Sequence, residues 1–126
     1  MKMSTLSRMD ALLVLIRQGK YEFADERICQ QYMEEYFSQL GLTFLREYRL
    51  QDGLSIIDFY FPNSGVGLEV KASKKWNKMA VYRQCHRYCK NEEIKGLILA
   101  TARPQGLPES INGKPSIIYL LGENGL

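Results

Sequence analysis

The first third of the chain has apolar residues at the spacing of an amphipathic helix, in two successive segments. Residues 5–18 predict a first helix that ends at Gly19. Its apolar positions are Leu6, Met9, Leu13 and Ile16. Residues 21–40 predict a second helix that ends before Gly41, with a stripe made of Phe23, Ile28, Met33, Phe37 and Leu40. The apolar face of the first helix can either pack on the core or contact a partner protein, and the sequence does not decide between these two roles.

The pattern then changes to the alternation that is typical of strands. Residues 42–50 predict a strand, followed by a turn at residues 51–53. Two further apolar runs, residues 54–61 and 66–73, flank a Pro-Asn-Ser-Gly cluster at residues 62–65. This arrangement predicts a β-hairpin.

The last third of the chain predicts one more helix and two more strands. The helix covers residues 76–91 and the strands cover residues 96–102 and 116–121, with a proline-containing loop at residues 104–115. A helical crossover makes the strands 66–73 and 96–102 parallel, whereas the three earlier strands form an antiparallel meander. We therefore expect a single domain over residues 1–126, with an α/β fold in which helices cover both faces of a mixed (α+β) sheet.

Three charged side chains interrupt the apolar hairpin: Asp58, Glu69 and Lys71. Side chains alternate between the faces of a strand, so Glu69 and Lys71 share one face, and the hairpin brings Asp58 alongside them. One interpretation is a salt-bridge cluster on a solvated face. The other is a Mg²⁺ site, because Mg²⁺ takes oxygen ligands and is held by one or two carboxylates. Burial of such a cluster is unfavourable unless the charges are paired or bind a metal.

Composition and charge favour a globular protein that binds a polyanion. The 126 residues are 45% hydrophobic and 25% charged, with a net charge of +3. Residues 71–90 hold seven of the 17 Lys and Arg residues and no Asp or Glu. The alternative is a solvated helix face, but the run begins at Lys71, beside the two acids. We expect this basic stripe to bind a polyanion.

Other classes are disfavoured. No apolar run is long enough to span a bilayer, and the N-terminus lacks the features of a signal peptide, so we expect a cytoplasmic protein without membrane partners. The three cysteines, Cys29, Cys85 and Cys89, do not form a disulfide framework or a set of zinc ligands. His86, the single histidine, is expected on a surface or in helix packing rather than as a base.

The order of elements, with Asp58 and the tripeptide Glu69-Val70-Lys71 eleven positions later, resembles the PD-(D/E)xK nuclease superfamily. Its restriction-endonuclease-like core is α-β-β-β-α-β, with an aspartate on the second strand and an acid-x-lysine tripeptide on the third. The resemblance covers residues 21–121. It implies an extra N-terminal helix within residues 1–20 and an additional C-terminal strand.

Further residues of this chain match the superfamily by position. An acid on the first core helix matches Glu26, with Glu22 as the alternative. Gln84 and Tyr88 match a Gln-x-x-x-Tyr element found in RecB-type nuclease domains, where both would contact phosphate or the catalytic lysine. Ile57 replaces the proline of the nominal motif, and cysteines for an iron–sulfur cluster are absent. The small size is similar to that of junction resolvases and VRR-type nucleases.

The resemblance implies a metal-dependent DNA nuclease, more specifically a Mg²⁺-dependent endonuclease in which Mn²⁺ can substitute. Asp58, Glu69, the Val70 carbonyl and Glu26 would hold the metal, while Lys71 would position water and stabilise the transition state, assisted by Gln84. The nucleic acid would be bound by five cations and a tyrosine: Lys74, Lys75, Lys78, Arg83, Arg87 and Tyr88. RNA as substrate and a homodimer both stay open. Two alternatives also stay open: a catalytically inactive nucleic-acid-binding module and a regulatory subunit with the same fold.

Overall fold

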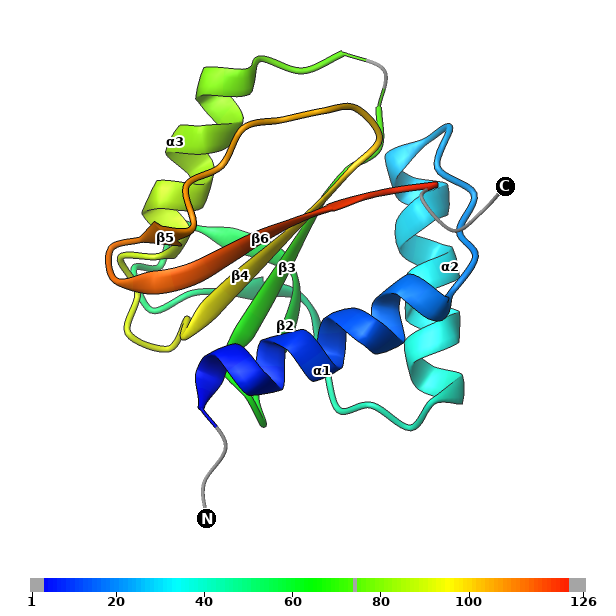
Figure 1. Ribbon diagram of the computed structural model, residues 1–126, viewed down its shortest axis with the longest axis horizontal. Coiled ribbons are helices and arrows are strands. Elements are labelled where there is room, and N and C mark those ends of the chain that lie inside the picture. The colour runs from blue at the N-terminus through cyan, green and yellow to red at the C-terminus, as the bar shows by residue number, and fades with distance from the viewer. Residues whose placement is uncertain (1–3, 74, 123–126) are drawn as a thin grey trace.

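The computed structural model describes residues 4–73 and 75–122, and this part of the chain forms three helices and six strands (Figure 1). The helices are α1 (Thr5–Gln18), α2 (Glu26–Gln39) and α3 (Lys78–Tyr88). The strands are β1 (Leu45–Arg49), β2 (Ile56–Phe61), β3 (Val66–Lys71), β4 (Gly96–Thr101), β5 (Ser110–Ile111) and β6 (Lys114–Leu120). The fold is therefore mixed α+β.

The strands form one open sheet in the order β1-β2-β3-β4-β6-β5. As predicted, β1, β2 and β3 are antiparallel neighbours, and β3 pairs in parallel with β4 through a crossover that contains α3. β6 is also parallel to β4. The carboxyl ends of β3, β4 and β6 consequently lie along one edge of the sheet.

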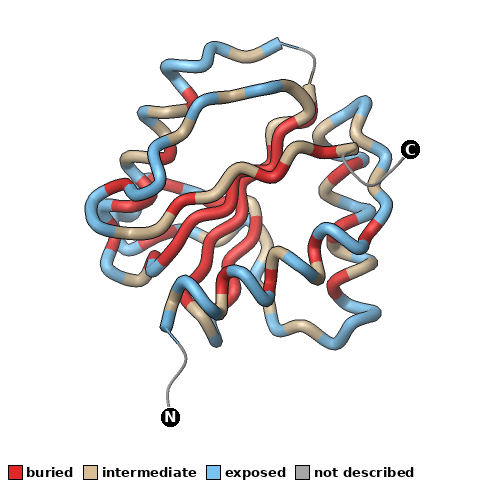
Figure 2. Tube along the Cα trace, in the orientation of Figure 1, coloured by how far each residue is buried: buried red, intermediate tan, exposed pale blue. Residues whose placement is uncertain are grey.

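Helices cover both faces of the sheet, as the sequence predicts. α1 and α2 lie on one face and α3 on the other (Figure 1). Met9, Met33 and Phe37 from the first pair of helices pack with one side of the central strands. Cys85 and Tyr88 of α3 pack in a second cluster on the other side. The central strands are buried over most of their length (Figure 2).

Two of the differences from the predicted elements have clear physical reasons. α2 begins at Glu26 rather than at residue 21, because the Asp25 side chain accepts a hydrogen bond of 3.1 Å from the Ile28 N–H and caps the helix there. The predicted loop at residues 104–115 contains the short strand β5, which pairs with β6 in antiparallel orientation. Asn112 and Gly113 at this turn have φ angles of 52° and 76°, as in a two-residue hairpin.

β1 and β2 change face together at one point. Ile57 belongs to the α3-side cluster and Phe59 to the opposite one, although residues two apart on a regular strand share a face. Glu47, which lies across from Asp58 in the register, has a φ of 47°. The pairing of β2 with β3 ends at Phe59↔Leu68, so the two strands separate at Asp58.

Candidate active site

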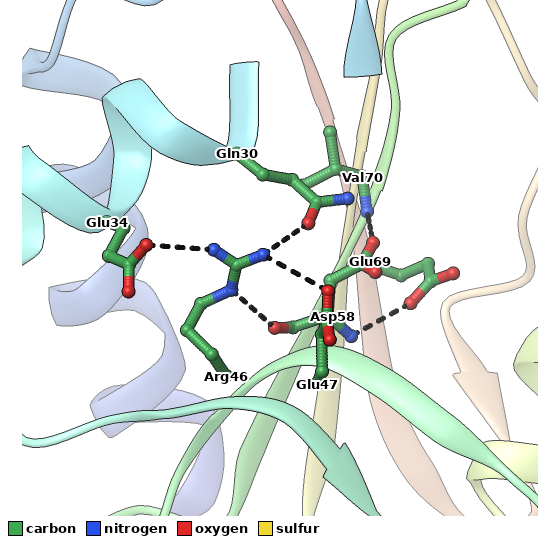
Figure 3. A network of polar contacts seen from close by, with 7 residues as sticks. All are labelled: Gln30, Glu34, Arg46, Glu47, Asp58, Glu69 and Val70. Carbon is green, nitrogen blue, oxygen red and sulfur yellow. Dashed lines mark hydrogen bonds and ion pairs between the residues drawn. The ribbon is translucent and has the colours of Figure 1, made fainter. Parts of the chain in front are cut away.

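Two carboxyl groups bridge the place where β2 and β3 separate. The Asp58 Oδ2 atom accepts a hydrogen bond of 2.8 Å from the Val70 N–H, and the Glu69 Oε1 atom accepts one of 3.2 Å from the Asp58 N–H (Figure 3). Each acid therefore binds the backbone of the other strand where the ladder of main-chain bonds has ended. The predicted convergence of Asp58 and Glu69 is present in the structure.

Lys71 lies next to this pair of acids. Its Nζ atom is 3.4 Å from Oε2 of Glu69, and its side chain is 19% exposed whereas that of Glu69 is 4% exposed. Leu68 and Val70, between these positions, pack on the opposite face as the alternation predicts. Lys71 and Glu69 thus form an ion pair whose carboxylate is buried and whose ammonium is half-buried.

The two acids share an environment that disfavours full ionisation. Burial raises the pKa of Glu69 to about 8, and the Asp58 carboxylate adds to this shift while the Lys71 ammonium opposes it. Burial also raises the pKa of Asp58, whereas the hydrogen bond from the Val70 N–H and the positive charge of Lys71 lower it. One ammonium thus faces two acids, and a further positive charge would favour the ionised form of both.

The structure places Glu26, rather than Glu22, near this cluster. Glu26 is the first residue of α2, whereas Glu22 lies in the exposed segment before the helix. Burial raises the pKa of Glu26, and the Lys71 ammonium and the Ala72 N–H lower it. Glu26 also lines a groove between α2, β1 and the segment after β3.

Gln84 and Tyr88 lie one helical turn apart on α3 and interact directly. Gln84 Nε2 donates a hydrogen bond of 2.8 Å to the Tyr88 hydroxyl, which donates one of 3.0 Å to the carbonyl of Ile56. The hydroxyl also lowers the pKa of Glu69 by hydrogen bonding. It has one proton, so it can donate to only one of these two acceptors at a time. Tyr88 is 1% exposed, so its side chain packs beneath the acids and is not part of the surface where contact with nucleic acid was predicted.

The carbonyl of Val70, predicted as a metal ligand, points towards the acids. The N–H and C=O of one strand residue point to the same side. The Val70 N–H binds Asp58, so its carbonyl faces the same separation between the strands. The carbonyl of Lys71 points the other way and accepts from the Ala102 N–H at 2.9 Å.

Arg46 joins α2 to the strand that holds Asp58, and sequence reasoning did not identify it. It donates at 2.7 Å to Gln30, at 3.2 Å to Glu34 and at 3.3 Å to the carbonyl of Asp58 (Figure 3). Its guanidinium also lies 4.6 Å from the centre of the Phe59 ring. Gln30 and Glu34 are four positions apart on one helix face, and this spacing is a signal that could have suggested a shared cation.

The predicted cations lie on the surface. Lys75, Lys78, Arg83 and Arg87 are exposed, and three of them belong to α3. Lys74 lies outside the described residues. The three cysteines are buried free thiols, as expected.

A divalent cation such as Mg²⁺ needs several oxygen donors in one place. No group of three or more His, Cys, Asp or Glu side chains in residues 4–73 and 75–122 is arranged to hold a metal ion. A buried carboxylate (Glu69), a half-buried one (Asp58) and a backbone carbonyl are nevertheless the hard oxygen donors that Mg²⁺ accepts while it keeps several waters. The residues present therefore fit such an ion in its hydrated form.

Comparison with family models, curated proteins and solved structures finds no significant match for this chain. Within the part of the chain that the structure describes, none of the helices has the length and apolarity that crossing a bilayer requires.

Proposed function

We propose that this protein is a metal-dependent nuclease that hydrolyses phosphodiester bonds of DNA, with Mg²⁺ as cofactor and Mn²⁺ as a substitute. One observation carries the proposal: the buried Glu69 and the half-buried Asp58 and Lys71 meet where β2 and β3 separate. The element order of the described chain is also compatible with a restriction-endonuclease-like core that has an added N-terminal helix and C-terminal strands. The exposed cations of α3 supply a surface for the substrate backbone.

Each residue has a defined role in this proposal. Asp58, Glu69 and the carbonyl of Val70 would hold the metal, with Glu26 reaching it through water. A bound Mg²⁺ supplies a positive charge that neutralises the scissile phosphate and lowers the pKa of water. Lys71 orients the attacking water and stabilises the negative charge that develops on the phosphate. Gln84 holds the hydroxyl of Tyr88 and so helps to position Glu69.

The decisive experiment incubates the purified protein with plasmid, single-stranded and four-way-junction DNA, and with RNA, in Mg²⁺, Mn²⁺ or EDTA. Cleavage is expected with either metal and not in EDTA. Asp58→Asn and Lys71→Ala should each lower the rate by about 100-fold or more, since each removes a charge that the transition state requires. Asp10→Ala, on the exposed side of α1, is the matched control and should retain activity. Cleavage that persists in EDTA, or in both variants, would refute the proposal.

A catalytically inactive nucleic-acid-binding module is the second candidate, and the exposed α3 cations favour it equally. It predicts binding that survives Lys71→Ala, with no cleavage under any metal condition. A homodimer would bring two active sites to the two strands of a duplex. Sedimentation velocity of the protein, free and with duplex DNA, measures whether the protein is a monomer or a dimer.

A further inference from the structure

Arg103 follows β4 at the edge of the sheet where the candidate site lies. Thr101, the last residue of β4, pairs with Lys71 in the parallel register, and the Ala102 N–H donates to the Lys71 carbonyl at 2.9 Å. Arg103 is the next residue after this contact. In open sheets with parallel strands, ligands bind outside the carboxyl ends of those strands.

The guanidinium of Arg103 is held in place by Trp76. Its Cζ atom is 4.4 Å from the centre of the indole ring, and one of its nitrogens donates to the Trp76 carbonyl at 3.4 Å. The indole N–H donates to Gln105 at 2.9 Å, and Gln105 donates to the Lys78 carbonyl at 3.1 Å. The loop after β4 and the start of α3 therefore fix the orientation of this cation.

Arg103 lacks the acidic partners that Arg46, another half-buried arginine, has. Arg46 contacts the carboxylates of Glu34 at 3.2 Å and Glu47 at 3.8 Å. No acid within the described residues forms an ion pair with Arg103. Glu22 and Arg103 do line one surface hollow together. The Nε atom of Arg103 is buried without a hydrogen-bond acceptor in this part of the chain.

Arg103 is half-buried and has no carboxylate to offset its charge, and an anion bound to the guanidinium would supply that negative charge. The planar fork of an Arg side chain matches the two oxygens of a phosphate. Stacking on an aromatic ring reduces the motion that the side chain loses on binding. The exposed Lys75 precedes Trp76 and the exposed Lys78 begins α3 two residues after it, so that a polyanionic chain meets several cations there.

We propose that Arg103, held against Trp76, binds a backbone phosphate of the nucleic acid next to the one at the candidate active site. This assignment rests on the proposed function, because it takes the phosphate to be part of a nucleic-acid chain. Free phosphate offers the same oxygens to the guanidinium, so the test compares the two sources.

The fluorescence of Trp76 measures this contact, because Trp76 is the single tryptophan of the chain. The protein is titrated with a ten-nucleotide single-stranded DNA in EDTA, so that no cleavage intervenes, and separately with inorganic phosphate. The DNA is expected to give a saturable change in emission, and phosphate a much weaker one. Arg103→Ala should weaken DNA binding by about five- to tenfold and lower the slope of log K against log salt by about one.

Two further variants separate loss of the contact from loss of the fold. Arg103→Gln keeps a planar group on the indole without the charge and should weaken binding to a similar extent, with a melting temperature close to that of the wild type. Arg49→Ala is the matched control, since Arg49 is exposed on β1 and bonds to the carbonyl of Gly53 at 2.8 Å. It should leave the titration unchanged.

The outcomes distinguish this inference from the proposed function. Unchanged DNA binding by Arg103→Gln and Arg103→Ala, in a protein whose wild type cleaves DNA, overturns the inference and leaves the nuclease proposal intact. Arg103-dependent binding without cleavage under any metal condition supports the phosphate contact and refutes the nuclease. A Trp76 response that is as strong with inorganic phosphate as with DNA, or absent with both, overturns the assignment to a nucleic-acid backbone.

Discussion

At the scale of single residues, Glu69 is the side chain whose charge state matters most. It is 3% exposed, and its two oxygens contact the Asp58 N–H and the Lys71 ammonium. Its pKa of about 8 means that the pair of acids retains a proton near neutral pH until a further positive charge arrives. Protonation of Glu69 and binding of a cation are therefore competing events.

Stability should fall as the pH rises through this range. The pKa of Glu69 lies near 4.5 in the unfolded chain and at about 8 in the folded protein. The folded state consequently binds more protons between these values, and the free energy of unfolding decreases as pH increases from 5 to 8. Glu69→Gln should flatten this dependence. Thermal unfolding at several pH values measures it, and an equal slope in both proteins would contradict the prediction.

Mg²⁺ should stabilise the protein more at pH 8 than at pH 6, because cation and proton compete for the same acids. At concentrations about 10 to 100 times the dissociation constant, the gain in the free energy of unfolding is about 1–3 kcal/mol. The stabilisation should disappear in Asp58→Asn and persist in the control Asp10→Ala. Calorimetric melting with and without Mg²⁺ measures the stabilisation. An equal increase in the stability of Asp58→Asn would show that the ion binds at another site.

The sequence predicted the three central side chains of the site but not the residues that support them. Asp58, Glu69 and Lys71 interrupt an apolar hairpin, so a pattern of local alternation is enough to find them. Arg46 and Arg103 depend on partners that are distant in the sequence, Glu34 and Trp76 respectively. Local periodicity contains no information about such contacts, which arise from the packing of whole elements.

At the scale of elements, the shared change of face in β1 and β2 determines the geometry of the site. The period-two pattern predicted both strands and their antiparallel pairing, but not this irregularity. Glu47 has no glycine-like sequence signal for its φ of 47°. Helix ends were missed for a similar reason, because the residues before Glu26 continue an apolar pattern although Asp25 caps the helix.

Replacement of Glu47 by glycine should not destabilise the protein. A non-glycine residue in the left-handed region is unfavourable by about 1–2 kcal/mol, whereas glycine loses about 0.5–1 kcal/mol in chain entropy. The expected outcome lies between no change and a gain of about 1 kcal/mol. Arg49→Gly, two positions later on the same strand, should lose about 1 kcal/mol. Urea unfolding of both variants compares them, and equal losses would argue against strain at Glu47.

Gly67 allows β3 to pass close to the side chain of Ile57. A Cβ atom at this position would lie 2.3 Å from Cδ1 of Ile57 and 3.2 Å from Cδ1 of Ile94. Gly67→Ala should therefore destabilise the protein by about 1–3 kcal/mol through overpacking. Ile57→Val removes the Cδ1 atom, so the double variant should be more stable than the sum of the two single losses predicts. Additive losses in chemical unfolding would contradict this steric explanation.

At the scale of the whole molecule, the sheet separates a basic face from the face covered by α1 and α2. The helix α3 carries Lys78, Arg83 and Arg87, all exposed. Because the order of elements and their pairing follow from strand and helix periodicity, this arrangement was predictable from the sequence. The short strand β5 was not included, although Asn112-Gly113 is a typical hairpin signal.

Binding of nucleic acid should therefore depend on salt and on the α3 face. Arg83→Ala and Arg87→Ala should each weaken binding uniformly across DNA sequences and lower the salt slope by about one. Lys20→Ala, an exposed cation in the connection between α1 and α2, is the control and should have little effect. Fluorescence anisotropy with a labelled duplex at several salt concentrations tests this. Equal effects of all three substitutions would indicate a non-specific charge response.

The hydrogen bonds across the gap between β2 and β3 have a practical consequence for the design of inactive variants. Asp58 and Glu69 each accept a hydrogen bond from the neighbouring strand with one carboxylate oxygen, and the second oxygen takes no part in that bond. An amide at either position keeps the acceptor for this hydrogen bond and removes the negative charge, whereas alanine removes both the charge and the hydrogen bond between the strands. On the nuclease proposal, Asn and Gln variants would therefore bind a substrate without cutting it, whereas loss of activity in an alanine variant could reflect either disruption of the sheet or loss of the negative charge.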